Sequence, residues 1–380
     1  NLLPVRAHRM EIRAIPRRRI DRPFGLRDLL DGRPGLAVEA RPLELPETVA
    51  DFLGADGDSE IIFTSGGTEA NHAAIHGALK ASTRRRSVIT TKVEHLSVLN
   101  VFKGLEQEGY GVTYVNVDEK GHLDLDGLRA HLSADTALVS VMHANNETGV
   151  LFPMDEIGRE VKGWGAFFHV DAVQSIGKVP VRLRDTSIDL LSLAGHKFHG
   201  PKGVGALFLR RGTPWRPTFL GGAQERKRRA GTENVAGIVG LAEACTLAAS
   251  GLAGRNERIA FLRDKLENSL LSAIPGVQIN GDRTRRVSNT SNLSFQGVDS
   301  ESMLIALSEE GICASSGSAC TTGAVELSHV LTAMGLGEDR VRGALRFSLS
   351  AYNTERDIDA VIEKTISVTA NFRTLAESEV

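Results

Sequence analysis

The sequence is poor in cysteine and lacks clustered metal ligands. It contains three cysteines, Cys245, Cys313 and Cys320, and no Cys or His residues with the spacing of a zinc site. An odd, sparse set of cysteines does not build a disulfide framework, so we expect a reducing, cytoplasmic location. We also expect no protein-bound metal ion.

Long apolar runs and a strong excess of either charge are missing as well. No run approaches the roughly 18 apolar residues of a membrane span, and no N-terminal stretch has the residue order of a signal peptide. The formal net charge of −2 provides no electrostatic reason to expect nucleic acid or an anionic membrane as a partner. The 380 residues are instead enough for one large and one smaller globular domain.

Lysine is missing from the first part of the chain. The first lysine is Lys80, whereas residues 1–41 contain ten arginines and five acidic residues without helix or strand periodicity. We interpret residues 1–57 as an atypical N-terminal segment. An arginine-rich, lysine-free stretch is typical of GC-rich DNA read out of frame, so our hypothesis is that part of this segment is frame-shifted. A basic targeting arm is the alternative.

From about residue 58, short apolar runs alternate with helix-like stretches. This alternation predicts a mostly parallel sheet with helices on both faces and with the ligand beyond the carboxyl ends of the strands. After about residue 250 an amphipathic segment at 256–274 leads into a different pattern, which predicts a smaller α+β domain. The predicted strands of the large domain are 61–64, 87–90, 112–115, 137–141, 166–170, 189–191 and 205–209, and those of the small domain are 291–295 and 344–349.

Two charged residues follow predicted strands where chemistry could occur. Lys197 lies in the Gly-rich stretch 195–203, where burial and nearby positive groups would lower its pKa and free the amine for attack on an aldehyde. Asp171 ends the strand at 166–170, where a carboxylate could keep a ring nitrogen of a cofactor protonated. Taken alone, Lys197 would be a solvated loop lysine and Asp171 a helix N-cap.

Two further segments contain a glycine turn and a cysteine among small residues. Gly67 and Thr68 link a predicted strand to a helix, and free backbone N–H groups there suit a phosphate. The turn matches neither a P-loop nor a dinucleotide fingerprint, so nucleotide binding is not favoured. Cys320 has small neighbours, which favours an exposed, reactive thiol, whereas Cys313 and Cys245 are expected to be ordinary buried cysteines.

Five segments, taken in their order along the chain, form a family signature. They read Phe-Thr-Ser-Gly-Gly-Thr-Glu at 63–69, His-Ala-Asn-Asn-Glu-Thr-Gly at 143–149, Gly-His-Lys at 195–197, Arg-Ala-Gly-Thr-Glu-Asn at 229–234 and Ser-Ser-Gly-Ser-Ala-Cys-Thr at 315–321. Together they resemble the cysteine desulfurases, a branch of the class V aminotransferase-like, fold-type-I pyridoxal-phosphate enzymes, and most closely the nitrogen-fixation (NifS) type. The implied architecture is a large, mostly parallel sheet domain at 58–250 and a smaller α+β C-terminal domain at 251–380.

The resemblance also implies roles for single residues. Lys197 would bind pyridoxal 5'-phosphate covalently, His95 would stack on its ring and move protons, and Cys320 would receive the sulfur of the substrate. Arg346 would clamp the substrate carboxylate, and Asn146 would contact cofactor or substrate. The other implied cofactor contacts are Asp171 on the pyridine nitrogen, Gln174 on the ring hydroxyl oxygen, Gly67, Thr68 and His196 on the phosphate, and Thr232 on the phosphate of the neighbouring subunit.

The implied reaction converts L-cysteine to L-alanine and leaves the sulfur on Cys320 as a persulfide. The implied partners are a second copy of the chain in a homodimer and an iron–sulfur cluster scaffold protein that accepts the sulfur, with nitrogenase maturation as the expected role. One alternative is another class V activity, such as selenocysteine lysis or transamination, although transamination requires no thiol like Cys320. The other is a non-catalytic scaffold. The joint presence of five residues argues against it: Lys197, Asp171, His95, Cys320 and Arg346.

Overall fold

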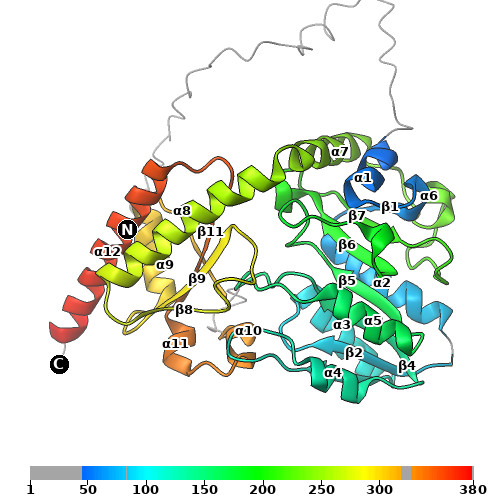
Figure 1. Cartoon of the computed structure of the whole chain (residues 1–380), viewed down its shortest axis with the longest axis horizontal. Helices are drawn as coiled ribbons and strands as arrows, with labels where there is room; N and C mark the ends of the chain where they lie inside the picture. The colour runs from blue at the N-terminus through cyan, green and yellow to red at the C-terminus, as the bar shows by residue number, and fades with distance from the viewer. Residues whose placement is uncertain (1–44, 83, 318–326, 379–380) are drawn as a thin grey trace, which may run out of the picture. The chain divides into compact units, whose positions relative to one another are not determined.

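The apolar runs predicted between residues 58 and 250 form one seven-stranded sheet (Figure 1). The computed structural model describes residues 45–82, 84–317 and 327–378. The strand order is β1-β7-β6-β5-β4-β2-β3, and β7 runs antiparallel to both of its neighbours while the other pairs are parallel. The strands are β1 (Ile61–Thr64), β2 (Ser87–Thr91), β3 (Gly111–Val115), β4 (Thr136–Met142), β5 (Phe167–Asp171), β6 (Leu190–Ala194) and β7 (Gly205–Leu209).

Burial on both faces explains why these strands read as continuous apolar runs. Every residue of β4, β6 and β7 is buried, as expected for a parallel sheet that is covered on both sides. The sequence predicts a strand at 189–191, and the structure extends it through Ala194. The mostly parallel α/β sheet is therefore confirmed.

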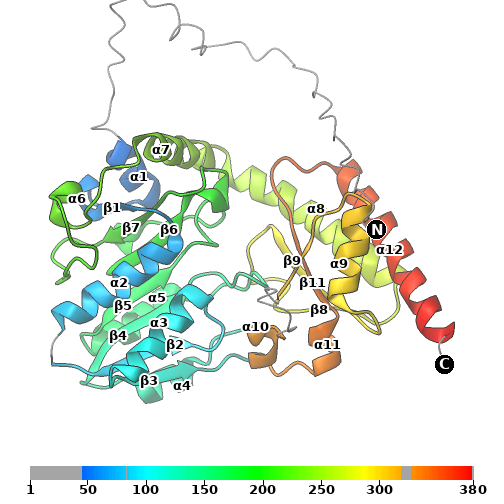
Figure 2. The same cartoon turned by 180° about the vertical axis from the view of Figure 1, so that it is seen from behind.

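Helices cover the large sheet in two layers (Figure 1 and Figure 2). α2 (Gly67–Ala81) and α3 (Leu96–Gln107) pack with one apolar cluster, which includes Phe102 and Leu138. The other cluster is formed with α1 (Leu45–Leu53), α4 (Leu125–His131), α5 (Met154–Gly163) and α7 (Val235–Ala249). Residues 1–44, most of the predicted atypical N-terminal segment, lie outside the described residues.

A second, smaller sheet is antiparallel throughout, in the order β10-β11-β9-β8. Its apolar cluster includes residues of α8, α9 and α12 and agrees with the predicted α+β pattern, while the domain boundary at 250/251 stays a prediction. The elements are α8 (Leu252–Ala273), β8 (Val277–Ile279), β9 (Thr290–Phe295), α9 (Ser300–Glu309), β10 (Ser315–Ser316), β11 (Ala344–Ser348) and α12 (Glu355–Ser378).

The remaining helices are short: α6 (Gln224–Lys227), α10 (His329–Ala333), α11 (Glu338–Arg342) and three 3-10 turns, Asp58–Glu60, Leu183–Asp185 and Gly195–Phe198. Within residues 45–82, 84–317 and 327–378, no single helix is long and apolar enough to cross a membrane. Only α7 and α8 taken together, bent by 79°, reach that length and composition.

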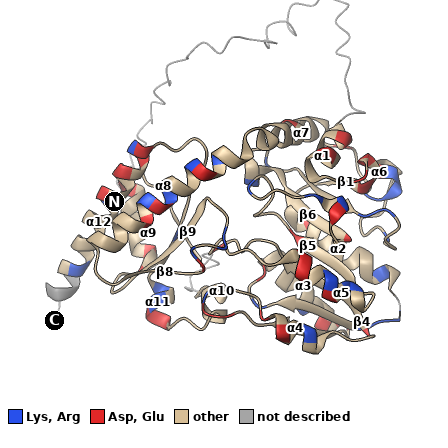
Figure 3. Ribbon diagram, viewed as in Figure 1, with Lys and Arg blue, Asp and Glu red and all other residues tan. Residues whose placement is uncertain are grey.

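Charged side chains are nearly excluded from both sheets. Figure 3 shows Lys, Arg, Asp and Glu mainly on helices and loops, while the strands are almost entirely uncharged. Among the described strands of the large sheet, Asp171 is the only Asp, Glu, Lys or Arg. Arg346 is the only one in the described strands of the small sheet. Each sheet therefore contains one strand residue whose charge must be compensated.

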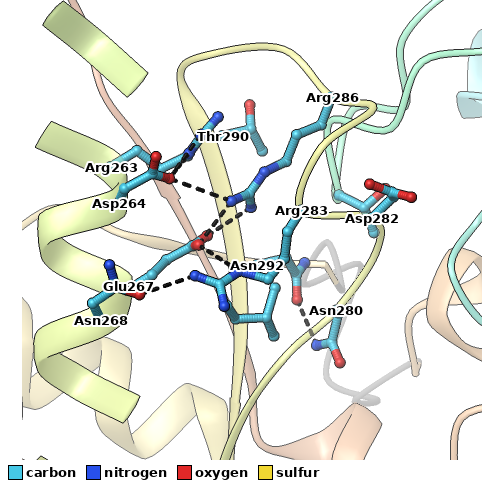
Figure 4. Close-up of polar contacts among 12 residues, drawn as sticks. Arg263, Asp264, Glu267, Asn268, Asn280, Asp282, Arg283, Arg286, Thr290 and Asn292 are labelled. Atoms are coloured by element: carbon cyan, nitrogen blue, oxygen red, sulfur yellow. Dashed lines mark hydrogen bonds and ion pairs between the residues drawn. The ribbon is translucent and has the colours of Figure 1, made fainter. Parts of the chain in front are cut away.

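A buried ion pair fixes the segment between β8 and β9, which contacts the loop after β4. Glu267 of α8 and Arg286 are both buried and form two charge-assisted bonds, at 2.6 and 2.7 Å (Figure 4). The backbone around Arg286 bonds to the loop after β4: Leu151 N donates to Arg285 O, and Val287 N donates to Gly149 O, both at 2.9 Å. The ion pair thus anchors the loop at 143–149 to α8.

Replacing Arg286 with Met should destabilise the fold, because it leaves Glu267 buried without its bidentate partner. We expect a loss of about 3–5 kcal/mol in the free energy of unfolding, measured by urea denaturation. Arg342→Met is the matched control, because Arg342 pairs with Glu338 in an exposed i,i+4 pair, and its cost should stay within about 1 kcal/mol. Equal losses in the two variants would contradict the role assigned to the buried pair.

Candidate active site

A cavity of about 250 Å³ lies at the carboxyl ends of β4, β5 and β6, against the N-terminus of α2. This is the place where open α/β sheets bind ligands. A larger hollow of about 510 Å³ beside α1 contains none of the sequence-predicted site residues. The cavity brings together eight of them: Gly67, Thr68, His95, Asn146, Asp171, Gln174, His196 and Lys197.

Asp171 places a buried carboxylate at the wall of this cavity. Its Oδ2 accepts a bond from Asn71 Nδ2 at 2.7 Å, and its Oδ1 accepts one from Val173 N at 2.9 Å. Burial raises the pKa of Asp171, while these bonds and the nearby His95 and Lys197 oppose the rise. Because both direct donors are neutral, the site is suited to a cationic group of a ligand.

A chain of hydrogen bonds connects Asp171 to His95. Asn71 Nδ2 also lies 2.9 Å from Ser97 Oγ, and Ser97 Oγ lies 2.8 Å from His95 Nδ1. Ser97 N donates to the same Nδ1 at 3.1 Å, so the neutral His95 ring carries its proton on Nε2. Sequence reasoning missed Asn71 and Ser97, although the spacing of His95 and Ser97 is that of a capping turn at the start of α3.

Lys197 reaches the cavity from the 3-10 turn that follows β6. Desolvation by the cavity walls and the positive charge of Arg346 lower the pKa of Lys197, against the opposite effect of Asp171. A lower pKa increases the fraction of neutral amine near neutral pH. Lys197 can therefore act as a nucleophile toward a carbonyl group and as a proton carrier.

The N-terminus of α2 also lines the cavity. Gly67 and Thr68 open this 15-residue helix, and its first N–H groups have no partner further up the helix. A Cβ on Gly67 would lie 2.6 Å from Val173 Cγ2, so glycine lets the helix approach the turn after β5 this closely. The helix end, its dipole and the Thr68 hydroxyl together suit a phosphate group.

The cavity also contains polar atoms that await a ligand. In the described part of the chain, Asn71 Oδ1 and Asn146 Oδ1 are buried without a hydrogen-bond partner. Such atoms are costly unless a ligand or water satisfies them. With Asp171, Lys197 and the start of α2, they form a donor and acceptor set that fits pyridoxal 5'-phosphate.

Arg346 lies beside the cavity rather than in its wall. Its Nη1 donates to Asn146 O at 2.6 Å, while Nε is buried without a partner among the described residues. Burial lowers the pKa of Arg346, and Glu147 opposes that change. The guanidinium thus has donor capacity left for an anion next to Asn146.

Besides Arg346, two sequence-predicted residues are not placed in the cavity, and one expectation about cysteine was wrong. Thr232 is exposed in the loop before α7, and its predicted contact with a neighbouring subunit stays a prediction. Cys320 lies outside the described residues. Cys245 is buried as expected, whereas Cys313 is exposed. Ile312 packs against the small-sheet cluster, and neighbouring side chains in an extended chain point to opposite sides, so Cys313 faces solvent.

Sequence reasoning also missed Glu94, a buried carboxyl under the cavity. Its Oε1 accepts bonds from Thr91 Oγ1 at 2.7 Å and Met142 N at 2.9 Å, while Oε2 has no partner among the residues that the structure describes. Burial raises the pKa of Glu94 to about 8. Glu94 is therefore mostly protonated at neutral pH, and its carboxyl binds Thr91 and the backbone of Met142 as a neutral group.

Comparisons with known proteins agree with this geometry. The model of the class V aminotransferase family matches residues 41–361. The chain is 53% identical to a cysteine desulfurase of Nostoc sp. and 49% identical to the cysteine desulfurase NifS of Azotobacter vinelandii, each over 87% of this chain and 82% of the relative. A solved NifS-like protein superimposes with a TM-score of 0.81 at 38% identity, covering 87% of both chains. A NifS-like protein from Rickettsia africae gives 0.77 at 33%, covering 86% of this chain and 88% of the other.

Glu94→Gln tests the protonated state of this buried carboxyl. A carboxyl that is neutral in the fold and ionised in the unfolded chain binds a proton on folding, so stability falls as the pH rises from about 4.5 to about 8. Glutamine removes this loss, and the advantage of the variant over the parent should grow between those pH values. Urea unfolding at several pH values measures it, and two parallel stability profiles would contradict the assignment.

Proposed function

The chain belongs to the class V aminotransferase family, and from this premise we propose that it converts L-cysteine to L-alanine with pyridoxal 5'-phosphate and takes the sulfur onto Cys320 as a persulfide. It is an enzyme of the cysteine desulfurase branch. The observation that carries the proposal is the cavity that joins Lys197, Asp171 and His95 to the N-terminus of α2.

The residues of the cavity would hold the cofactor through several of its groups. When bound, pyridoxal 5'-phosphate supplies an aldehyde that takes up an amine and a pyridine ring that accepts electrons from the substrate. Lys197 is the amine for the aldehyde, and Asp171 is the acceptor for the pyridine nitrogen. The remaining contacts are assigned to Gln174 on the ring oxygen, to Asn146, and to Gly67, Thr68 and His196 on the phosphate.

Lys197 and His95 would move the protons of the reaction. The lowered pKa of Lys197 makes its amine available as a base beside the cavity. Burial lowers the pKa of His95 as well, so its ring is a neutral group with a proton on Nε2. The bonds from Ser97 to Nδ1 fix this tautomer and the ring orientation.

Arg346 would bind the carboxylate of L-cysteine. Its Nε has no partner among the described residues. Together with its place next to Asn146, this leaves a planar fork of donors for two carboxylate oxygens. Holding the carboxylate orients the amino group of the substrate toward Lys197 and its sulfur away from the carboxylate end.

Cys320 would then take the sulfur. Its thiolate forms a new bond to the substrate sulfur while the carbon–sulfur bond of the substrate breaks, and the electron pair stays on the carbon, which takes up a proton to become the methyl group of alanine. Cys320 lies outside the described residues, so this role rests on the motif at 315–321 and on the similarity to cysteine desulfurases.

The chain would work as a homodimer that delivers sulfur to an iron–sulfur scaffold protein. Large apolar side chains near Thr232 support a protein interface: Phe219, Leu220, Val235 and Val239 are exposed, Leu220 to 78%. The similarity to the NifS of Azotobacter vinelandii supports a role in nitrogenase maturation.

Lys197→Ala and Cys320→Ala should separate cofactor chemistry from sulfur transfer. Lys197→Ala should release no sulfide from L-cysteine, because no other lysine lines the cavity that the structure describes. Cys320→Ala should still change the absorption of the bound cofactor when L-cysteine is added, yet release almost no sulfide. Cys313→Ala, which removes an exposed thiol elsewhere, is the matched control and should keep parent activity. Full sulfide release by Cys320→Ala would overturn the proposal.

Arg346→Lys tests the carboxylate contact. A lysine keeps the positive charge but not the two-pronged fork, so the KM for L-cysteine should rise by roughly tenfold or more. Arg342→Lys, in an exposed pair with Glu338, controls for the same substitution elsewhere. Steady-state sulfide release gives KM and kcat, and an unchanged KM in Arg346→Lys would place the substrate carboxylate elsewhere.

A further inference from the structure

Glu147 is a buried carboxylate that the reaction described above does not use. It is 2% exposed and directly follows Asn146 in the loop after β4. Its backbone is fixed on both sides: Glu147 N donates to Asn145 Oδ1 at 2.9 Å, and Glu147 O accepts from Asn292 Nδ2 at 3.3 Å. Burial raises the pKa of Glu147 to about 7, while Ser328 and Arg346 oppose the rise. Burying a carboxylate costs free energy unless the group is paired and hydrogen-bonded.

The Glu147 carboxylate touches the chain on both sides of the segment that contains Cys320. After that segment, Ser328 Oγ donates to Glu147 Oε2 at 2.6 Å. Before it, a Cβ on Gly317 would lie 2.2 Å from the same Oε2 and 2.9 Å from Ser328 Cβ. One oxygen atom therefore holds Ser328 and lies against the backbone of Gly317. The nine residues 318–326 that run between these flanks are outside the described residues.

The chain on either side of the segment that contains Cys320 is also connected to Arg346. β10, just before Gly317, pairs with β11 so that Ser315 lies opposite Arg346. Arg346 donates to Asn146 O, one residue before Glu147, and the charges of Arg346 and Glu147 attract each other. The residue assigned to the substrate carboxylate, the Glu147 carboxylate and both flanks of the Cys320 segment thus form one contiguous cluster.

We propose that Glu147 is a positioning residue for sulfur transfer: by binding Ser328 and lying against Gly317 beside Arg346, its carboxylate sets where the segment with Cys320 leaves and rejoins the fold relative to the bound substrate. The proposal rests on the proposed function. Glu147 acts through Ser328 and Gly317 and contacts none of the reacting atoms. Fixing both ends of a short segment restricts the positions that its thiol can reach, and sulfur transfer requires that the thiol meet the substrate sulfur in line.

The test uses full-length holoenzyme with Glu147→Ala, Glu147→Gln, Ser328→Ala, Ser328→Thr and the double variant Glu147→Ala/Ser328→Ala. Glu147→Ala and Ser328→Ala should each lower kcat for sulfide release by roughly tenfold to a hundredfold. Displacing a reacting group by about 1 Å lowers a rate by this much. KM and the absorption change of the cofactor on adding L-cysteine should stay within about threefold of the parent, because binding precedes the transfer.

The pair should also behave as one contact. The double variant should be no slower than Glu147→Ala alone, because the hydrogen bond between the two residues is already lost. Ser328→Thr keeps the hydroxyl and should restore kcat to within about twofold of the parent. Glu147→Gln keeps an acceptor for Ser328 but loses the charge opposite Arg346, so its kcat should lie between those of the parent and Glu147→Ala.

Asp299→Ala is the matched control. Ser328 also caps α10 through Leu331 N, and Asp299 caps α9 through Ser302 N in the same way, without a contact to Glu147. Asp299→Ala should keep the parent kcat, and Ser328→Ala should not. Parent-like kcat in Glu147→Ala or Ser328→Ala would overturn the positioning role, and so would multiplicative losses of kcat in the double variant. In either case, sulfide release that depends on Cys320 would still support the proposed function. A parent enzyme that releases no sulfide would overturn both.

Discussion

The Asp171 carboxylate ends the middle strand of the large sheet, and its burial constrains everything around it. Neutral donors, Asn71 and the Val173 backbone, hold it at hydrogen-bond distance, and no other described strand residue of that sheet carries a charge. A charge this deep is stable only with a compensating partner. The cavity beside it, with Lys197 and the start of α2 along its walls, is shaped for a ligand that brings one.

Arg346 has the corresponding position in the small sheet. It is the only charged residue in the described strands there, and it faces Glu147 and Asn146 from the loop after β4. That loop is fixed in turn to α8 through the ion pair of Arg286 and Glu267. The reacting groups of the large sheet and the proposed substrate clamp of the small sheet are therefore connected through buried polar contacts rather than through a flexible surface.

Local patterns in the sequence predicted much of this arrangement. Apolar runs predicted the strands because a doubly covered parallel sheet leaves no polar face, and strand ends predicted where Asp171 and Lys197 would lie. Contacts between distant residues could not be predicted: Asn71 and Asp171 are 100 positions apart, and Glu147 and Ser328 are 181 apart. Cys313 shows the limit of local reasoning, because an apolar neighbour was taken as a sign of burial, whereas that neighbour packs inward and turns the thiol outward.

In the proposed reaction, sulfur leaves L-cysteine and reaches Cys320 through steps that begin at Lys197. Mass spectrometry of the peptide that contains Cys320 detects this transfer, when the holoenzyme is mixed briefly with L-cysteine and quenched with acid. We predict one added sulfur atom on Cys320 in the parent and none in Lys197→Ala. An unmodified Cys320 during turnover, or sulfur found on Cys313 instead, would contradict the account.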